Sequence, residues 1–202
     1  MELALFSIKS CRLRVIDQPN EPRVDLAEAM LREKCLAGVN GGYFEPDYAP
    51  VGLLISDGRM IAPLRKARLL SGVLSVANGQ VRLQRTSEFA MTLKITAAVQ
   101  CGPFLVDHAR AVLRLDNSRP ARRTFVAIGN ARQIALGFCS EVSLAQLSRI
   151  LLVPEIIAKF KIERALNLDG GSSSAFWFAN EGKAFSIPEQ KTVRDFVAIV
   201  PK

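Results

Sequence analysis

Short apolar stretches separated by turn sequences recur along this chain, and this pattern constrains its fold more than any other feature. The turns are of the kind that join neighbouring strands, and they are Ser56-Asp57-Gly58, Ala77-Asn78-Gly79, Gly129-Asn130 and Asn180-Glu181-Gly182. We therefore expect many short strands, over residues 3–8, 12–16, 37–40, 52–56, 72–76, 81–85, 94–99, 104–106, 125–129, 134–138, 165–168, 175–178 and 195–200.

Helices are expected to be few. Capping-box spacings predict helices over residues 25–34 and 143–152. Pro154 suits the first turn of a short third helix that ends at Phe160. Because the helices do not alternate with strands, the sequence predicts an α+β fold, with one sheet-rich domain and few helices, and not a doubly wound sheet.

The length of 202 residues and a hydrophobic content of 49% suffice for one core, so we expect a single domain over residues 1–202. No apolar run approaches the roughly 20 residues that span a bilayer, and the first residues lack the features of a secretion signal. The 4 cysteines are scattered, which favours reduced thiols. We therefore expect a cytoplasmic protein without a membrane partner, and the sequence leaves its oligomeric state open.

The segment over residues 165–174 combines an apolar strand with one carboxylate and a flexible backbone. Asp169 stands at the end of the strand, and the amides of Gly170 and Gly171 can face an anion or a sugar because neither residue carries a Cβ. Ser172 adds a hydroxyl that donates and accepts hydrogen bonds. The same residues also suit a tight turn in which Asp169 caps its own backbone.

A second segment has the same design of strand, polar residue and two glycines. It consists of Asn40, Gly41, Gly42, Tyr43 and Phe44. The asparagine can bond sugar hydroxyls, and the aromatic rings offer flat apolar area that packs on a sugar face. The alternative is a hairpin whose aromatic side chains belong to the core.

Two further segments carry polar side chains next to apolar strands. Gln100 and Gly102 follow one strand, while Arg122 and Arg123 enter another, and arginine binds phosphate with two parallel hydrogen bonds. Cys101 would be reactive beside Arg123, but a buried, inert thiol is the favoured interpretation.

Together these segments resemble the phosphodiester glycosidase family. The matching elements follow the family's order and extend over nearly the whole chain. They are residues 40–44, 50–53, 100–106, 123–124 and 168–173, with Arg194 in a closing strand.

The resemblance implies a hydrolase that cleaves the glycosidic bond of a sugar 1-phosphodiester. Because the leaving phosphate is weakly basic, one carboxylate assisted by arginines would suffice. Asp169 would act as base or nucleophile at the anomeric carbon, while Arg123 and Arg194 neutralise the phosphate. The expected substrate-binding residues are Asn40, Gly41, Gly42, Gln100, Gly102, Gly170, Gly171 and Ser172. Possible second carboxylates are Glu45, Asp47 and Glu141.

Two other functions stay open at this point. One is a serine hydrolase that uses Ser172 or Ser173 with His108 and an aspartate. The other is a non-enzymatic module that binds nucleic acid or acidic polysaccharide through the basic clusters at residues 65–68 and 119–123, in keeping with a net charge of +8.

The partner that we expect is a small molecule or glycan that carries a phosphodiester. Nucleic acid is not expected, because neither basic cluster is interleaved with aromatic residues. No cofactor is expected. Asp169 and Asn40 offer oxygen ligands for calcium or magnesium, but no acidic cluster has ligand spacing, so we predict no metal.

Overall fold

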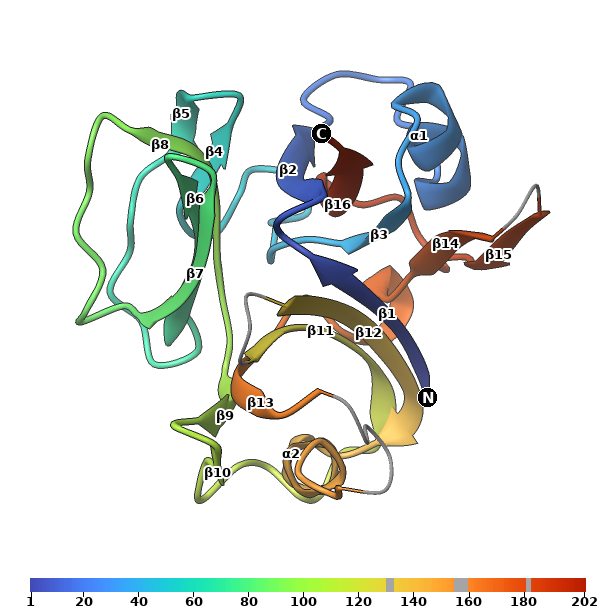
Figure 1. The fold of residues 1–202 in the computed structure, drawn as a ribbon. Helices are drawn as coiled ribbons and strands as arrows, with labels where there is room; N and C mark the ends of the chain where they lie inside the picture. The colour runs from blue at the N-terminus through green and yellow to red at the C-terminus, as the bar shows by residue number, and fades with distance from the viewer. Residues whose placement is uncertain (130–132, 155–159, 181–182) are drawn as a thin grey trace.

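Three antiparallel sheets make up most of the regular structure in the computed structural model of the chain (Figure 1). The structure describes residues 1–129, 133–154, 160–180 and 183–202. Two α-helices lie among these residues, near opposite ends of the molecule.

The first sheet has six strands, and helix α2 (Leu144–Ile150) packs against it. Ser143 caps this helix in a capping box with Gln146, and Leu147 on the helix is fully buried against the sheet. In spatial order the strands are β1 (Glu2–Ser7), β12 (Gln133–Val142), β11 (Ala121–Gly129), β13 (Ile162–Asn167), β9 (Phe104–Asp107) and β10 (Arg110–Ala111).

The second sheet has five strands and is covered by helix α1 (Leu26–Arg32). Asp25 caps α1, and Met30 reaches Gly38, whose missing side chain lets the helix approach the sheet. In spatial order the strands are β15 (Lys183–Ile187), β14 (Phe176–Asn180), β3 (Ala37–Asn40), β16 (Asp195–Pro201) and β2 (Cys11–Asp17).

The third sheet is built from hairpins. Its β4–β5 and β6–β7 turns contain Asp57-Gly58 and Asn78-Gly79, and all four of these residues have positive φ, as tight hairpin turns require. In spatial order the strands are β5 (Arg59–Ala62), β4 (Leu54–Ser56), β8 (Ile95–Cys101), β6 (Gly72–Ala77) and β7 (Gln80–Arg85).

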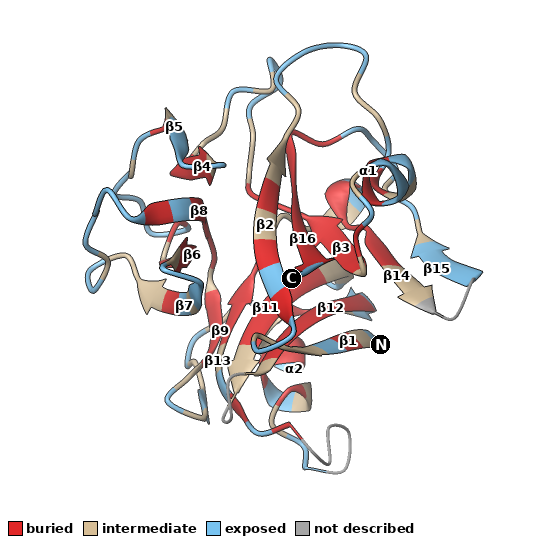
Figure 2. Cartoon of the chain, turned by 45° about the horizontal axis from the view of Figure 1, so that its top comes forward, coloured by how far each residue is buried: buried red, intermediate tan, exposed pale blue. Residues whose placement is uncertain are grey.

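The largest hydrophobic cluster lies where the three sheets meet. It takes Leu166 from the first sheet, Val39 and Val197 from the second, and Leu54 and Val99 from the third. Figure 2 shows buried segments (red) along the middle of the strands and exposed residues at the hairpin tips. The arrangement brings strand ends from all three sheets close together.

The sequence predicts most of these elements, with some corrections. The structure is mostly β, so the α+β assignment fits only in part. Strands β5, β10 and β15 were not predicted, because they are short or largely exposed and lack an apolar alternation. Residues 155–159 of the expected third helix, and the expected turns at 130 and 181–182, lie outside the described residues. The single-domain organisation stays a prediction.

No helix among the described residues is both long enough and apolar enough to cross a membrane. All four cysteines are buried and free.

Candidate functional site

The candidate site forms where chain segments leave strands of all three sheets. Asp169 follows β13 of the first sheet, and the Gly41-Gly42 turn follows β3 of the second. Gly102 follows β8 of the third sheet, and its carbonyl accepts a hydrogen bond of 2.6 Å from the Tyr43 hydroxyl. The Asn40–Phe44 segment and Gly102 are therefore neighbours in space.

Hydrogen bonds to two other segments of the chain fix the backbone of Asp169. Its carbonyl accepts from Asn40 Nδ2 at 2.7 Å and from Thr124 Oγ1 at 2.9 Å. Its N–H donates to the carbonyl of Gly41 at 3.0 Å. Because these bonds use main-chain atoms, the carboxylate stays available for chemistry.

The Asp169 carboxylate is partly buried and carries a perturbed pKa. Burial raises the pKa of Asp169 above its ordinary value, while the Ser173 hydroxyl, the Lys191 charge and the Gly170 N–H oppose the rise. The Gly170 N–H donates to Oδ1 at 2.9 Å. A carboxylate whose pKa is raised is a stronger base than one with an ordinary pKa.

Arg123 of β11, which the sequence predicts to hold the phosphate, lies beside this turn. A Cβ atom placed on Gly170 would lie 3.2 Å from Arg123 Nη1. The other nitrogens are used, because Nε donates to the Val142 carbonyl at 3.3 Å and Nη2 to the Arg119 carbonyl at 2.9 Å. Nη1 therefore faces the glycine turn while the rest of the guanidinium is fixed.

Arg194 does not lie in this position. Its guanidinium binds both oxygens of Asp17 at 2.7 and 3.2 Å and donates to the Tyr48 carbonyl at 3.1 Å. The side chain is buried against β2 and the loop at Tyr48. The structure thus assigns Arg194 to a structural ion pair, and not to the neutralisation of a phosphate beside Asp169.

Lys191 supplies a cation that the sequence did not predict. It lies on the segment over residues 188–194, which connects β15 to β16. The Gln190 N–H in this segment donates a hydrogen bond of 2.7 Å to the Ser172 carbonyl. Lys191 Nζ lies 4.8 Å from the centre of the Phe44 ring, and its charge lowers the pKa of Asp169. No local sequence pattern marks this lysine, because its neighbours come from distant segments.

Asp195 is a second carboxyl group near Asp169, and the sequence did not predict this either. Its Oδ1 accepts from the Gly42 N–H at 3.1 Å. The predicted second carboxylates Glu45, Asp47 and Glu141 are exposed. A signal was present, since Asp195 begins an apolar strand in the same way that Asp169 ends one.

Two predicted substrate-binding side chains have structural partners instead. Asn40 is buried, and its Oδ1 accepts from Thr124 Oγ1 at 2.8 Å and from the Ala175 N–H at 3.1 Å. Gln100 is also buried, and it bonds the backbone of Leu53 and Arg65. Their hydrogen-bonding atoms are occupied by the protein, so these two residues hold the site together and do not face a ligand.

The predicted glycines serve different purposes. Gly102 packs against the Leu69 carbonyl, which leaves no room for a side chain. Gly171 has a φ of 65°, which favours glycine. The remaining predicted residues are placed around Asp169: Gly41 and Gly42 are buried, Gly170 is partly buried, and Ser172 is exposed.

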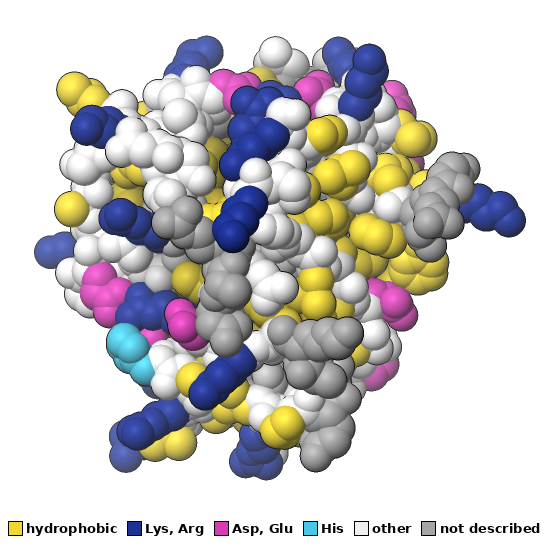
Figure 3. Space-filling view, viewed as in Figure 1, with side chains coloured by type: hydrophobic (Ala, Val, Ile, Leu, Met, Phe, Trp, Pro, Cys, Tyr) yellow, Lys and Arg dark blue, Asp and Glu magenta, His cyan; other side chains and the backbone are white. Residues whose placement is uncertain are grey.

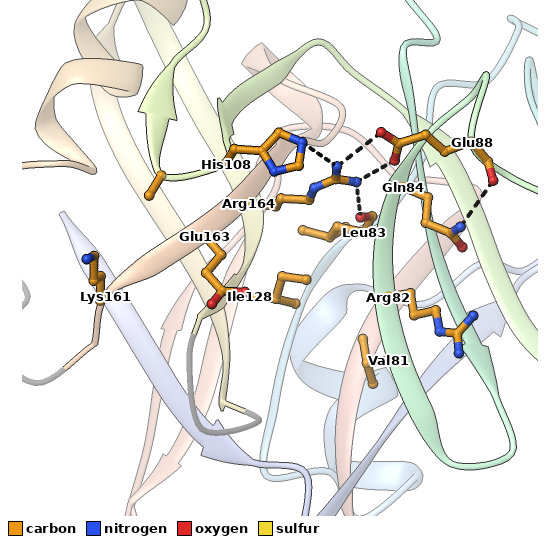
Figure 4. A pocket seen from close by; sticks show the side chains of 11 residues that line it. Val81, Arg82, Leu83, Gln84, Glu88, His108, Ile128, Lys161, Glu163 and Arg164 are labelled. Atoms are coloured by element: carbon orange, nitrogen blue, oxygen red, sulfur yellow. Dashed lines mark hydrogen bonds and ion pairs between the residues drawn. The ribbon is translucent and has the colours of Figure 1, made fainter.

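His108 lies away from the serines, in a hollow of about 820 Å³ between β7 and β13 (Figure 4). Its ring contacts Arg164 at 3.2 Å, near the start of β13, whereas Ser172 and Ser173 follow the end of that strand. From Arg164 to the end of β13 at Asn167 the strand extends about 10 Å, and Ser172 lies five residues beyond that end. The structure therefore does not assemble the serine triad.

The two basic clusters differ in structure. Residues 65–68 are exposed, whereas Arg122 and Arg123 of the second cluster bond backbone carbonyls. Figure 3 shows Lys and Arg spread over one face with acidic side chains among them. Within the described ranges, no group of three or more His, Cys, Asp or Glu side chains could hold a metal ion.

The fold and the site together define a mostly-β domain that holds a carboxylate and cations at a glycine-lined turn. A sequence profile of the phosphodiester glycosidase family matches residues 33–200, so the chain belongs to this family. In Escherichia coli (strain K12), the uncharacterized protein YigE is 31% identical over 90 residues, which cover 41% of this chain and only 35% of that relative.

Solved structures share the fold at low sequence identity. The catalytic domain of zebrafish N-acetylglucosamine-1-phosphodiester alpha-N-acetylglucosaminidase, auto-inhibited by its pro-peptide, matches with a TM-score of 0.72 and 14% identity, over 100% of this chain and 83% of that one. A protein from Burkholderia pseudomallei K96243 described as a putative exported protein matches with a TM-score of 0.69 and 14% identity, over 98% of this chain and 73% of that one. A hypothetical protein from Synechocystis matches with a TM-score of 0.65 and 15% identity, over 99% of this chain and 59% of that one.

Proposed function

We propose that this protein is a hydrolase that cleaves the glycosidic bond of a sugar 1-phosphodiester, with Asp169 as base or nucleophile. One observation carries the proposal: Asp169 is partly buried on a turn fixed by its backbone, with Arg123 beside the adjoining Gly170 and the Lys191 charge close enough to lower its pKa. Membership of the phosphodiester glycosidase family supports it, as does the name of the zebrafish relative.

The reaction adds one water across the bond between the anomeric carbon and the phosphate oxygen. With Asp169 as base, the carboxylate takes a proton from water, and the water oxygen bonds to the anomeric carbon. The carbon–oxygen bond breaks, and its electron pair stays on the phosphate. The products are a free sugar and a phosphate monoester, to which the proton passes from Asp169.

The cations contribute where negative charge develops. As the bond breaks, charge collects on the leaving phosphate, so a positive group held nearby stabilises the transition state more than the ground state. Arg123 Nη1 and Lys191 Nζ would hold this phosphate. Arg194 is left out of this role because Asp17 already pairs with it.

Asn40 and Thr124 act as positioning residues in this proposal. Their hydrogen bonds to the Asp169 carbonyl hold the turn in place, so the carboxylate does not have to be ordered during the reaction. The cytoplasmic location stays a prediction.

The test is incubation of the purified protein with a panel of nucleotide sugars and sugar 1-phosphodiesters, with mass spectrometry to detect a free sugar. Asp169→Asn should reduce turnover by about 10³-fold or more while the melting temperature changes little. Glu163→Gln, at an exposed acid near the other end of β13, is the matched control and should keep full activity. Unchanged turnover in Asp169→Asn would reject the proposal.

A further inference from the structure

Among the residues that the structure describes, Asp195 is the only acidic one that is buried, and 2% of its surface is exposed. It begins β16, and the buried Val197 and Ile199 follow it at alternate positions of the strand. Residues at such a spacing face the same side of a sheet. Asp195 therefore places a carboxyl group at the end of an otherwise apolar row, where β16 meets the site.

The Gly41-Gly42 turn wraps around this carboxyl group. Oδ1 accepts the Gly42 N–H at 3.1 Å, and the main-chain carbonyl of Asp195 accepts the Gly41 N–H at 2.8 Å. A Cβ atom on Gly41 would overlap Oδ1, so the glycine is needed to admit the carboxyl group. The Gly41 carbonyl in turn accepts the N–H of Asp169 at 3.0 Å. Asp195 thus reaches Asp169 through one residue.

The charges around Asp195 disfavour its ionisation. Burial is the main cause that raises the pKa of Asp195, to about 7, against the opposing effect of the Gly42 N–H. Asp17 on β2 and Asp169 after β13 raise it further, while Arg194 on β16 lowers it. Cys101 on β8 is also near, and burial raises the pKa of its thiol, so it brings no charge.

We propose that Asp195 is a positioning residue of the site that works in its protonated form, holding the Gly41-Gly42 turn against Asp169 without adding a second negative charge. This inference rests on the proposed function for its effect on catalysis. When Asp195 ionises, its charge faces Asp169 across one glycine and repels an anionic phosphodiester. Activity should therefore fall as pH rises above about 7.

The test compares the wild type with Asp195→Asn and Asp195→Ala. Asparagine keeps an oxygen that accepts the Gly42 N–H but cannot ionise. At pH 6 we expect Asp195→Asn to keep kcat/KM within about threefold of the wild type, and Asp195→Ala to lose about 100-fold or more because the turn loses its partner. Between pH 7 and 9 the wild type should lose about tenfold per pH unit, and Asp195→Asn should not.

A melting series makes the test independent of any substrate. Because the folded-state pKa of Asp195 is raised, its contribution to stability is complete at low pH and is lost as pH rises toward about 7. The melting temperature of Asp195→Asn minus that of the wild type should therefore increase between pH 4 and 7 and then level off.

The two measurements separate the possible failures. If the wild type cleaves nothing in the panel but the melting difference follows this course, the proposed function fails while the protonated Asp195 is supported. If the melting difference is flat with pH, or if Asp195→Asn shows the wild-type alkaline loss of activity, the inference about Asp195 is overturned. Equal damage from asparagine and alanine at pH 6 would also overturn it.

Discussion

Single charged side chains determine the electrostatic environment of the Asp169 carboxylate, and Lys191 is the clearest case. Its ammonium lowers the pKa of Asp169, and it is held over the Phe44 ring. Asp169 acts in its ionised form, so activity is lost as pH falls through its pKa. Removal of the lysine charge should move this acidic loss to higher pH.

The variant Lys191→Gln tests this prediction. The acidic limb of kcat/KM against pH should shift upward, and KM for a phosphodiester should rise about tenfold, the value of one charge-assisted contact to phosphate. Lys94→Gln, at an exposed lysine before β8, is the control. A profile for Lys191→Gln that matches this control would contradict the role of Lys191.

Residue roles could be predicted where the local motif contains the chemistry. Asp169 and the glycines around it belong to one segment, so the sequence alone identifies a carboxylate on a flexible turn. The role of Arg194 could not be predicted, because its partner Asp17 is 177 positions away. An arginine that enters a strand beside a binding motif can pair with a ligand or with an acid, and only the fold decides between them.

At the scale of elements, Gln100 connects strand β8 to the loop that precedes β6. Its side chain accepts from the N–H groups of Leu53 and Arg65, both at 3.0 Å, and donates to the Arg65 carbonyl at 2.6 Å. A contact with substrate would make Gln100 important for KM. A structural role would make it important for stability instead.

The variant Gln100→Ala distinguishes these roles. It leaves backbone groups of two residues without partners, and we expect the free energy of unfolding to fall by about 3 kcal/mol. The KM of the folded protein should stay within about twofold of the wild type. Urea unfolding and steady-state kinetics measure the two quantities, with Gln80→Ala at an exposed position of β7 as the control. A large rise in KM with unchanged stability would restore Gln100 as a ligand-binding residue.

Elements could be predicted where the pattern is local and strong. The two capped helices and the hairpins at Asp57-Gly58 and Asn78-Gly79 follow directly from turn and cap chemistry. Strand β15 could not be predicted, because its residues are mostly exposed and gain their partner only by pairing with β14. Strand pairing is made by backbone hydrogen bonds, and these do not depend on the pattern of apolar residues in the sequence.

At the scale of the whole molecule, the order of strands in the sheets was beyond prediction, because it depends on contacts between distant segments. One of the links between sheets is Arg164 of β13, whose guanidinium is drawn in Figure 4. It donates to the Leu83 carbonyl on β7 at 2.9 Å and pairs with Glu88 at 2.6 Å and Asp107 at 3.1 Å. The first and third sheets are therefore tied together at Arg164, five residues before Asp169 along the chain.

This separation predicts that Arg164→Met affects stability and not catalysis. The change removes one of the positive charges that pair with the mostly buried Asp107 carboxylate, which should lower the free energy of unfolding by about 2 kcal/mol at pH 7.

The Arg164 side chain also lowers the pKa of Glu88 to about 2. The stabilisation from this ion pair is therefore complete above about pH 4.5 and is lost as pH falls toward 2. The melting difference between wild type and variant should shrink over that range, while kcat/KM at pH 7 stays unchanged. A loss of activity as large as that of Asp169→Asn in a folded Arg164→Met protein would mean that the hollow at His108 takes part in the reaction, because the two ends of β13 would then no longer act independently.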